Sequence, residues 1–182
     1  LELPVAGTPP AGRSGAVRIG NILFVGGHTS GPEFRGKLGD EISVEQGYEA
    51  AKQACLACLA DVKAVIGDLD KVKQVAKLLC MVNSMPDFVQ QPLVANGATD
   101  LLSELYGDAG SHARSAVGMG SLPNAACIEI EMILDEDGNE LDSLYVITAF
   151  NGNACLLQQK RFPILFHSRI APVFVTIKHF FT

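Results

Sequence analysis

Two strand-like runs joined by a turn constrain this fold more than any other stretch of the sequence. The runs are Ala113 to Met119 and Ala125 to Leu134, and the turn is Gly120-Ser121-Leu122-Pro123. Glycine and proline in so short a segment predict a four-residue hairpin loop. The resulting register places Arg114 directly opposite Glu129, with Cβ atoms roughly 4.5–5.5 Å apart.

The predicted hairpin gathers one arginine and two carboxylates. Side chains alternate along a strand, so Glu131 shares a face with Glu129. A cross-strand ion pair on the protein surface would explain the same pattern. Spacing alone therefore leaves two interpretations of Arg114 and Glu129, a surface ion pair and a binding site.

Length and composition limit the class of protein. At 182 residues the chain is long enough for one domain with a proper core, and we expect one domain followed by a tail. The net charge of −6, without a basic run, argues against nucleic-acid binding. No apolar run is long enough for a membrane span, so we expect a soluble protein without a membrane partner.

Five cysteines without a regular framework favour a reducing, cytoplasmic location over a secreted disulfide scaffold. The chain begins at Leu1 without a signal-peptide pattern, which leaves open a leader that was removed or is missing. Cys55 and Cys58 form a C-x-x-C pair, but no second cluster offers further zinc ligands. We therefore predict that both cysteines are core residues and that the protein has no metal site.

The remaining elements follow in order along the chain. Gly20-Asn21 joins two short strands, Ala16 to Ile19 and Ile22 to Val25. Ser43 and Gln46 form a capping box, and the helix that they begin has one apolar stripe and ends at Gly67. A central strand then covers about Asp70 to Met81, and a second helix runs from Gln90 or Pro92 to Tyr106. The order ββαβαββ predicts an α+β fold, in which two helices cover one face of a mixed sheet.

Several phrases in this chain resemble the RidA family, also called YjgF. They are Ala113-Arg114-Ser115, Leu122-Pro123 and Ile128-Glu129-Ile130-Glu131, and the spacing of fifteen residues from Arg114 to Glu129 also fits. A subgroup of the family has phrases similar to Gly67–Lys73, Met81–Phe88 and His112–Gly118. The resemblance extends from about Arg13 to Leu134.

The resemblance implies a chorismate-mutase-like homotrimer with a pocket at each subunit junction. It implies hydrolysis of enamines and imines such as 2-aminoacrylate to 2-keto acids and ammonia, as in 2-iminobutanoate/2-iminopropanoate deaminases, without a cofactor. Arg114 would bind the substrate carboxylate through two parallel hydrogen bonds, and Glu129 would position the attacking water. Gly27 and Asn96 match positions that line the family pocket. Considered without the family, Gly27 fits a tight bend and Asn96 fits an ordinary helix residue.

Two departures from the family pattern affect the expected chemistry. Arg13 stands near the position of an aromatic residue, and Ala116 replaces a cysteine often found two residues after the arginine, which excludes a thiol at that position. His28 and His112 flank the expected pocket, either as loop histidines or as proton carriers. A non-catalytic trimer that binds small carboxylates or a regulatory partner is the alternative function, and endoribonuclease activity fits the acidic charge least well.

The resemblance stops after Leu134, and we take residues 1–139 as the RidA-like domain. Residues 140–182 form a tail without a family match, rich in apolar runs and poor in charge. They are either an appended partner segment or a translated non-coding or shifted-frame sequence. We favour the second interpretation, in which the tail is non-native or disordered.

Overall fold

The computed structural model describes residues 2–137, 146–150 and 153–157. The chain divides into two units, residues 1–137 and 138–182. All the predicted site residues lie in the first unit.

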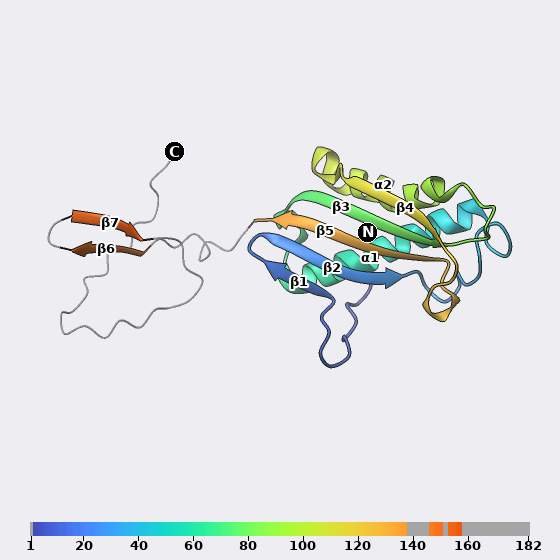
Figure 1. The fold of residues 1–182 in the computed structure, drawn as a ribbon, viewed down its shortest axis with the longest axis horizontal. Coiled ribbons are helices and arrows are strands. Elements are labelled where there is room, and N and C mark those ends of the chain that lie inside the picture. Colours follow the sequence, from blue (N-terminus) through green and yellow to red (C-terminus); the bar gives the residue numbers. More distant parts are fainter. Residues whose placement is uncertain (1, 138–145, 151–152, 158–182) are drawn as a thin grey trace. The chain divides into compact units, whose positions relative to one another are not determined.

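Five strands of the first unit form one mixed sheet (Figure 1). In chain order they are β1 (Ala16–Ile19), β2 (Ile22–Thr29), β3 (Val72–Asn83), β4 (Ala113–Met119) and β5 (Ile128–Glu136). Their order in the sheet is β1-β2-β5-β3-β4, and only β3 and β4 pair in parallel. A parallel pair needs a long crossover connection, which the second helix provides.

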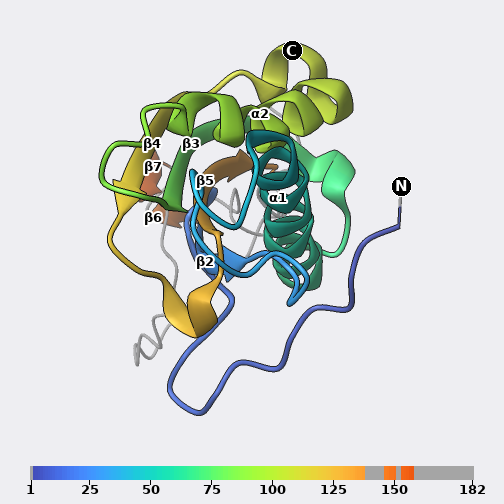
Figure 2. The ribbon, with the colours of Figure 1, turned by 90° about the vertical axis from the view of Figure 1, so that its right-hand side faces the viewer.

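Two helices cover one face of the sheet, as the sequence predicts (Figure 2). Helix α1 spans Val44–Ile66 and helix α2 spans Gln91–Tyr106. Both hydrogen bonds of the predicted capping box are present at the start of α1, because Ser43 and Gln46 each bind the other's backbone N–H. The α+β class and the order ββαβαββ are therefore confirmed.

The prediction that β4 and β5 form a hairpin is wrong. Strand β3 lies between these two strands and pairs with both of them (Figure 1). The segment after β4 includes a short 3₁₀ turn, Pro123–Ala125, and passes the end of β3, where Asn83 N–H donates to Cys127 O. Turn residues report only local chain reversal, so they cannot distinguish a tight hairpin from a connection that steps over a neighbouring strand.

The two faces of the sheet differ in their surroundings. Alternate residues of β3 and β5 are buried under the helices, and Cys55 and Cys58 of α1 are fully buried in the same core, as predicted. The opposite face carries large apolar side chains that remain exposed in a single chain. These are Val17, Ile19, Phe24 and Val117. An apolar sheet face of this kind is a candidate interface.

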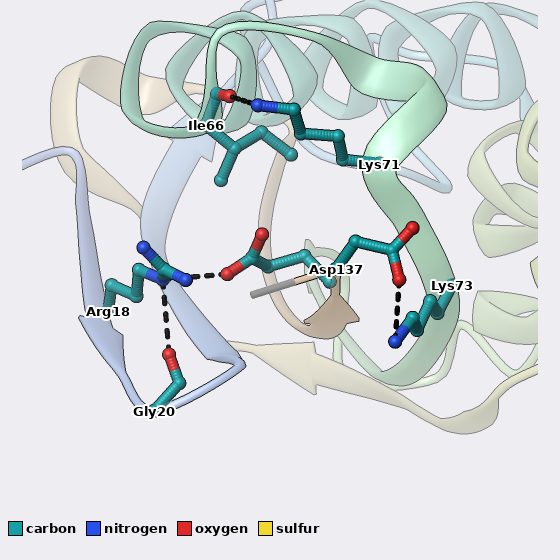
Figure 3. Close-up of polar contacts among 7 residues, drawn as sticks. Arg18, Gly20, Ile66, Lys71, Lys73 and Asp137 are labelled. Carbon is teal, nitrogen blue, oxygen red and sulfur yellow. Dashed lines mark hydrogen bonds and ion pairs between the residues drawn. The ribbon is translucent and has the colours of Figure 1, made fainter. Parts of the chain in front are cut away.

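One buried ion pair fixes the β1–β2 turn to the last residue of β5. Arg18 Nε lies 2.6 Å from Glu136 Oε1, and the Glu136 side chain is only 2% exposed. Arg18 Nε also donates to Gly20 O at 3.1 Å (Figure 3). The guanidinium therefore compensates a carboxylate that the fold has removed from water.

In the second unit, β6 (Val146–Phe150) and β7 (Asn153–Leu157) form an antiparallel pair. The interpretation of residues 140–182 as a tail falls mostly outside the described residues and stays a prediction. Within the described part of the chain, none of the helices is long and apolar enough to cross a bilayer.

Candidate functional site

Arg114 lies on edge strand β4, and its side chain is on the helix side of the sheet. Its backbone pairs with that of Leu78, a fully buried core residue of β3. Two residues of α2 hold the guanidinium, because Nη1 donates to Asn96 Oδ1 and to Thr99 Oγ1, each at 2.9 Å. The predicted Asn96 therefore belongs to the arginine site, whereas the sequence analysis did not single out Thr99.

The guanidinium keeps most of its binding capacity. The two contacts use both hydrogens of Nη1, and among the described residues Nε and Nη2 have no acceptor. Both acceptors are neutral, so neither balances the positive charge. A half-buried arginine with a free Nε and Nη2 edge can bind a carboxylate through two parallel hydrogen bonds.

His112 extends this hydrogen-bond network. Its Nδ1 lies 2.7 Å from Gly110 O, which can only accept, so Nδ1 carries a hydrogen. Its Nε2 lies 3.2 Å from Thr99 Oγ1, so in the neutral ring the threonine hydroxyl donates to Nε2. That hydroxyl then presents a lone pair to Arg114. His112 is thus linked to Arg114 through the hydroxyl of Thr99.

Glu129 and Gly27 also come together, on the other face of the sheet. Glu129 pairs with Thr29 of β2, next to a register shift between Val25 and His28. A Cβ atom built on Gly27 would lie only 1.9 Å from Glu129 Oε1, so the carboxylate occupies space that a side chain at position 27 would fill. Within the described residues, Glu129 accepts no hydrogen bond and forms no ion pair. Its oxygens are available to water or to a ligand.

Within one chain, the structure does not bring Arg114 and Glu129 together. Their register partners on β3, Leu78 and Met81, are three residues apart, and β3 separates the two strands. Strand spacing and rise place the two Cα atoms roughly 14 Å apart. The side chains also lie on opposite faces, which excludes both the predicted direct pairing and the alternative of a surface ion pair.

His28 lies apart from Arg114 and pairs with α1. Its Nε2 lies 2.9 Å from Asp61 Oδ2, and Asp61 is buried. This contact explains the histidine as a link between the sheet and the helix. His28, which was expected to flank the pocket, therefore has Asp61 of α1 as its partner.

A buried thiol lies beside the position of the missing cysteine. Cys80 of β3 pairs with Ala116 of β4, two residues from Arg114. Burial raises the pKa of the Cys80 thiol to about 12, and the nearby Arg114 offsets only part of that effect. A thiol with this pKa stays protonated at neutral pH and is a poor nucleophile. Among the described residues, no group of three or more His, Cys, Asp and Glu side chains is arranged to hold a metal ion.

The sheet order and the two helices on one face define the class of YjgF/chorismate-mutase-like α+β domains. The model of the family described as "YjgF/chorismate_mutase-like, putative endoribonuclease" matches residues 18–134. Protein TCP17 from Trypanosoma cruzi is 38% identical over 140 residues, which cover 74% of this chain and 88% of that protein. The chain therefore belongs to this family.

Solved structures show the same fold. Protein Atu1372 from Agrobacterium tumefaciens, described as of unknown function, is 39% identical with a TM-score of 0.71, over 75% of this chain and 87% of that one. A "putative endoribonuclease" from Shewanella oneidensis is 27% identical with a TM-score of 0.70, over 74% and 92%. TdcF from E. coli, solved with bound serine, is 20% identical with a TM-score of 0.51, over 74% and 94%.

Proposed function

We propose that this protein hydrolyses enamines and imines of the 2-aminoacrylate type, releasing a 2-keto acid and ammonia. The observation that carries the proposal is the guanidinium of Arg114. Two neutral acceptors hold it on one side, and its Nε and Nη2 hydrogens have no acceptor among the described residues. That arrangement suits a small substrate with a carboxylate beside its reactive carbon.

Arg114 would orient the substrate, and Glu129 would act on water. Water adds to the imine carbon, its proton passes to the nitrogen, and the tetrahedral adduct expels ammonia as the carbonyl forms. Glu129, whose oxygens have no partner in the part of the chain that the structure describes, could accept a proton from the attacking water. Imines already react with water, so orientation and one proton acceptor are sufficient catalysis.

A homotrimer would reconcile this chemistry with the separation of Arg114 and Glu129. The sheet face that carries Glu129 is also the apolar face without helices, including Phe24 and Val117. Packing of three such faces would bury these side chains and bring Glu129 of one subunit near Arg114 of the next. The complete site would then lie at the junction between subunits.

Freshly generated iminopropionate tests the proposal directly. The full chain should accelerate the release of both pyruvate and ammonia above the uncatalysed rate, in equal amounts. Sedimentation of the same sample should give the mass of three chains. An uncatalysed rate in a sample that sediments as a trimer would refute the deaminase function, whereas a stable monomer would remove the shared site.

Binding without catalysis is the second candidate function, and the separation of Arg114 from Glu129 favours it. The arginine alone would serve a trimeric module that binds small carboxylates. The TdcF structure contains bound serine, a small molecule with a carboxylate. At 20% identity, that structure shows the fold alone for this chain. Saturable pyruvate binding to a trimer without deaminase activity would support this candidate.

Endoribonuclease activity is part of the family description, but the net charge of −6 offers little attraction for RNA phosphates. Salt-dependent RNA binding would be needed to support it.

A further inference from the structure

A cavity lies away from Arg114, where β3 and β4 end beside the start of α2. Its volume is about 470 Å³. Its polar lining includes Lys37, Ser84 and Gln91. The side chains of Met85 and Met119 form an apolar part of the wall. Gly118 is four residues after Arg114 on β4, so the two positions are about 13 Å apart. None of the residues assigned to deamination lines this cavity.

Ser84 is an unusual feature of the cavity wall. The residue is 6% exposed, and its hydroxyl has no hydrogen-bond partner among the described residues. The hydroxyl lies at the cavity wall, where it can donate a hydrogen bond to a bound molecule. A ligand in the cavity could provide that partner.

Lys37 places a positive charge at the same cavity. Its ammonium donates to Asn83 Oδ1 at 3.1 Å and to Gly120 O at 2.5 Å, both neutral oxygens. An ammonium has three hydrogens, so one remains for a further acceptor. The neighbouring carboxylate of Glu41 binds the backbone N–H of Lys37 at 2.8 Å and forms no ion pair with its ammonium. The ammonium can therefore still bind an anion.

Gly118 brings two further donors together. A Cβ atom at this position would lie 3.0 Å from Gln91 Nε2 and 3.1 Å from Ser84 Oγ. Both polar groups therefore lie over the glycine backbone. Gln91 Nε2 uses one hydrogen on Phe88 O at 2.7 Å and keeps the other. The cavity thus combines one cation with two neutral donors.

We propose that this cavity binds a small organic acid. The carboxylate would accept hydrogen bonds from Lys37 and Ser84, with Gln91 as a third donor. A short apolar body would pack against Met85 and Met119. The set of donors fits an anion, and the apolar wall favours an aliphatic acid over an inorganic oxyanion.

Isothermal titration of the Arg114→Ala protein with butyrate tests this site, because that background removes the arginine proposed for deamination. Butyrate should bind with one site per chain, and sulfate should bind at least tenfold more weakly. Lys37→Met should weaken butyrate binding at least tenfold, and Ser84→Ala several-fold. Gly118→Ala should also weaken it, because the added methyl group crowds two of the donors.

Lys37→Arg is the matched control, since it keeps a cation and should retain most of the affinity. Ser84→Ala removes one hydroxyl from the cavity wall, so it tests the site even if Lys37→Met fails to fold. No butyrate binding at millimolar concentration, or binding that neither Lys37→Met nor Ser84→Ala weakens, would overturn the proposal. A protein with no deaminase activity could still bind butyrate here, so the two proposals can fail separately.

Discussion

Arg114 and Glu129 lie on opposite faces of one sheet, with strand β3 between the strands that carry them. A site that uses both residues must therefore be completed by a second chain. Subunit mixing tests this requirement. Arg114→Ala and Glu129→Gln proteins should each be nearly inactive, but equal amounts refolded together should regain activity.

The expected recovery follows from the geometry of a cyclic trimer. Each junction would take Arg114 from one subunit and Glu129 from the next, so about one junction in four would be intact in a random mixture. Activity should reach about a quarter of the level of the unmodified protein. A double variant, Arg114→Ala with Glu129→Gln, mixed with either single variant, is the control and should recover nothing. Failure of the two single variants to complement would contradict the shared site.

The second prediction separates the roles of the two residues. Arg114→Lys keeps the charge but loses the two parallel hydrogen bonds to a carboxylate, so kcat/KM should fall by about 10- to 100-fold. Glu129→Gln should lower kcat by about 100-fold with little change in KM, because its role is with water. Steady-state kinetics with iminopropionate measures both effects.

Thr99→Val is the matched control for positioning, because it removes a hydroxyl that accepts from Arg114 while nearly keeping the side-chain shape. We expect a several-fold increase in KM with kcat largely retained. If Arg114→Ala leaves pyruvate release unaltered, or unfolds the protein, the arginine is structural and the proposed function loses its main support.

The sequence predicted the local elements better than the pairing of strands. The capping box of Ser43 and the apolar stripe gave α1 correctly, because both signals come from neighbouring residues. The position of β3 between β4 and β5 depends on contacts between residues far apart in the chain, and turn residues carry no information about it. The hairpin register therefore failed although both strands exist.

The candidate site shows the same division. The family resemblance implied that Asn96 and Gly27 line a pocket, which stays a prediction; the structure shows Asn96 bonded to Arg114, and Gly27 against Glu129. Thr99 was missed although it lies three residues after Asn96, a spacing that puts both on one face of α2. This spacing could have indicated Thr99, but a helical threonine is often a surface residue. Only the fold shows that Thr99 faces Arg114 on β4.

The third prediction concerns pH and the buried thiol of Cys80. Burial raises its pKa from 9.0 to about 12, so between these values the unfolded chain releases a proton that the folded chain keeps. Stability from this group is complete below pH 9 and decreases as pH rises toward 12, by up to about 1.4 kcal/mol per pH unit. Urea unfolding from pH 8 to 11 measures this effect. The free energy of unfolding should decrease less steeply with pH in Cys80→Ala than in the unmodified protein. Equal slopes would contradict the raised pKa.

The fourth prediction concerns residues 140–182. Deleting them should leave the fold and the activity of the remaining chain intact, because none of the proposed site residues lies among them. Solubility should be unchanged or better, since apolar segments with few charges promote aggregation. Circular dichroism, sedimentation and deaminase assays of the shortened chain measure these outcomes. Loss of the trimer on deletion would show that this segment supports assembly.

The fifth prediction concerns the ion pair between Arg18 and Glu136. Arg18→Met would leave a carboxylate that is 2% exposed without its cation, so the free energy of unfolding should fall by about 3–5 kcal/mol at neutral pH. Replacing both residues, Arg18→Met with Glu136→Leu, removes the buried charge as well and should recover most of that loss. Denaturant titration of the three proteins measures both changes. A decrease below about 1 kcal/mol for Arg18→Met would show that water reaches Glu136 and that the pair contributes little, as exposed pairs do.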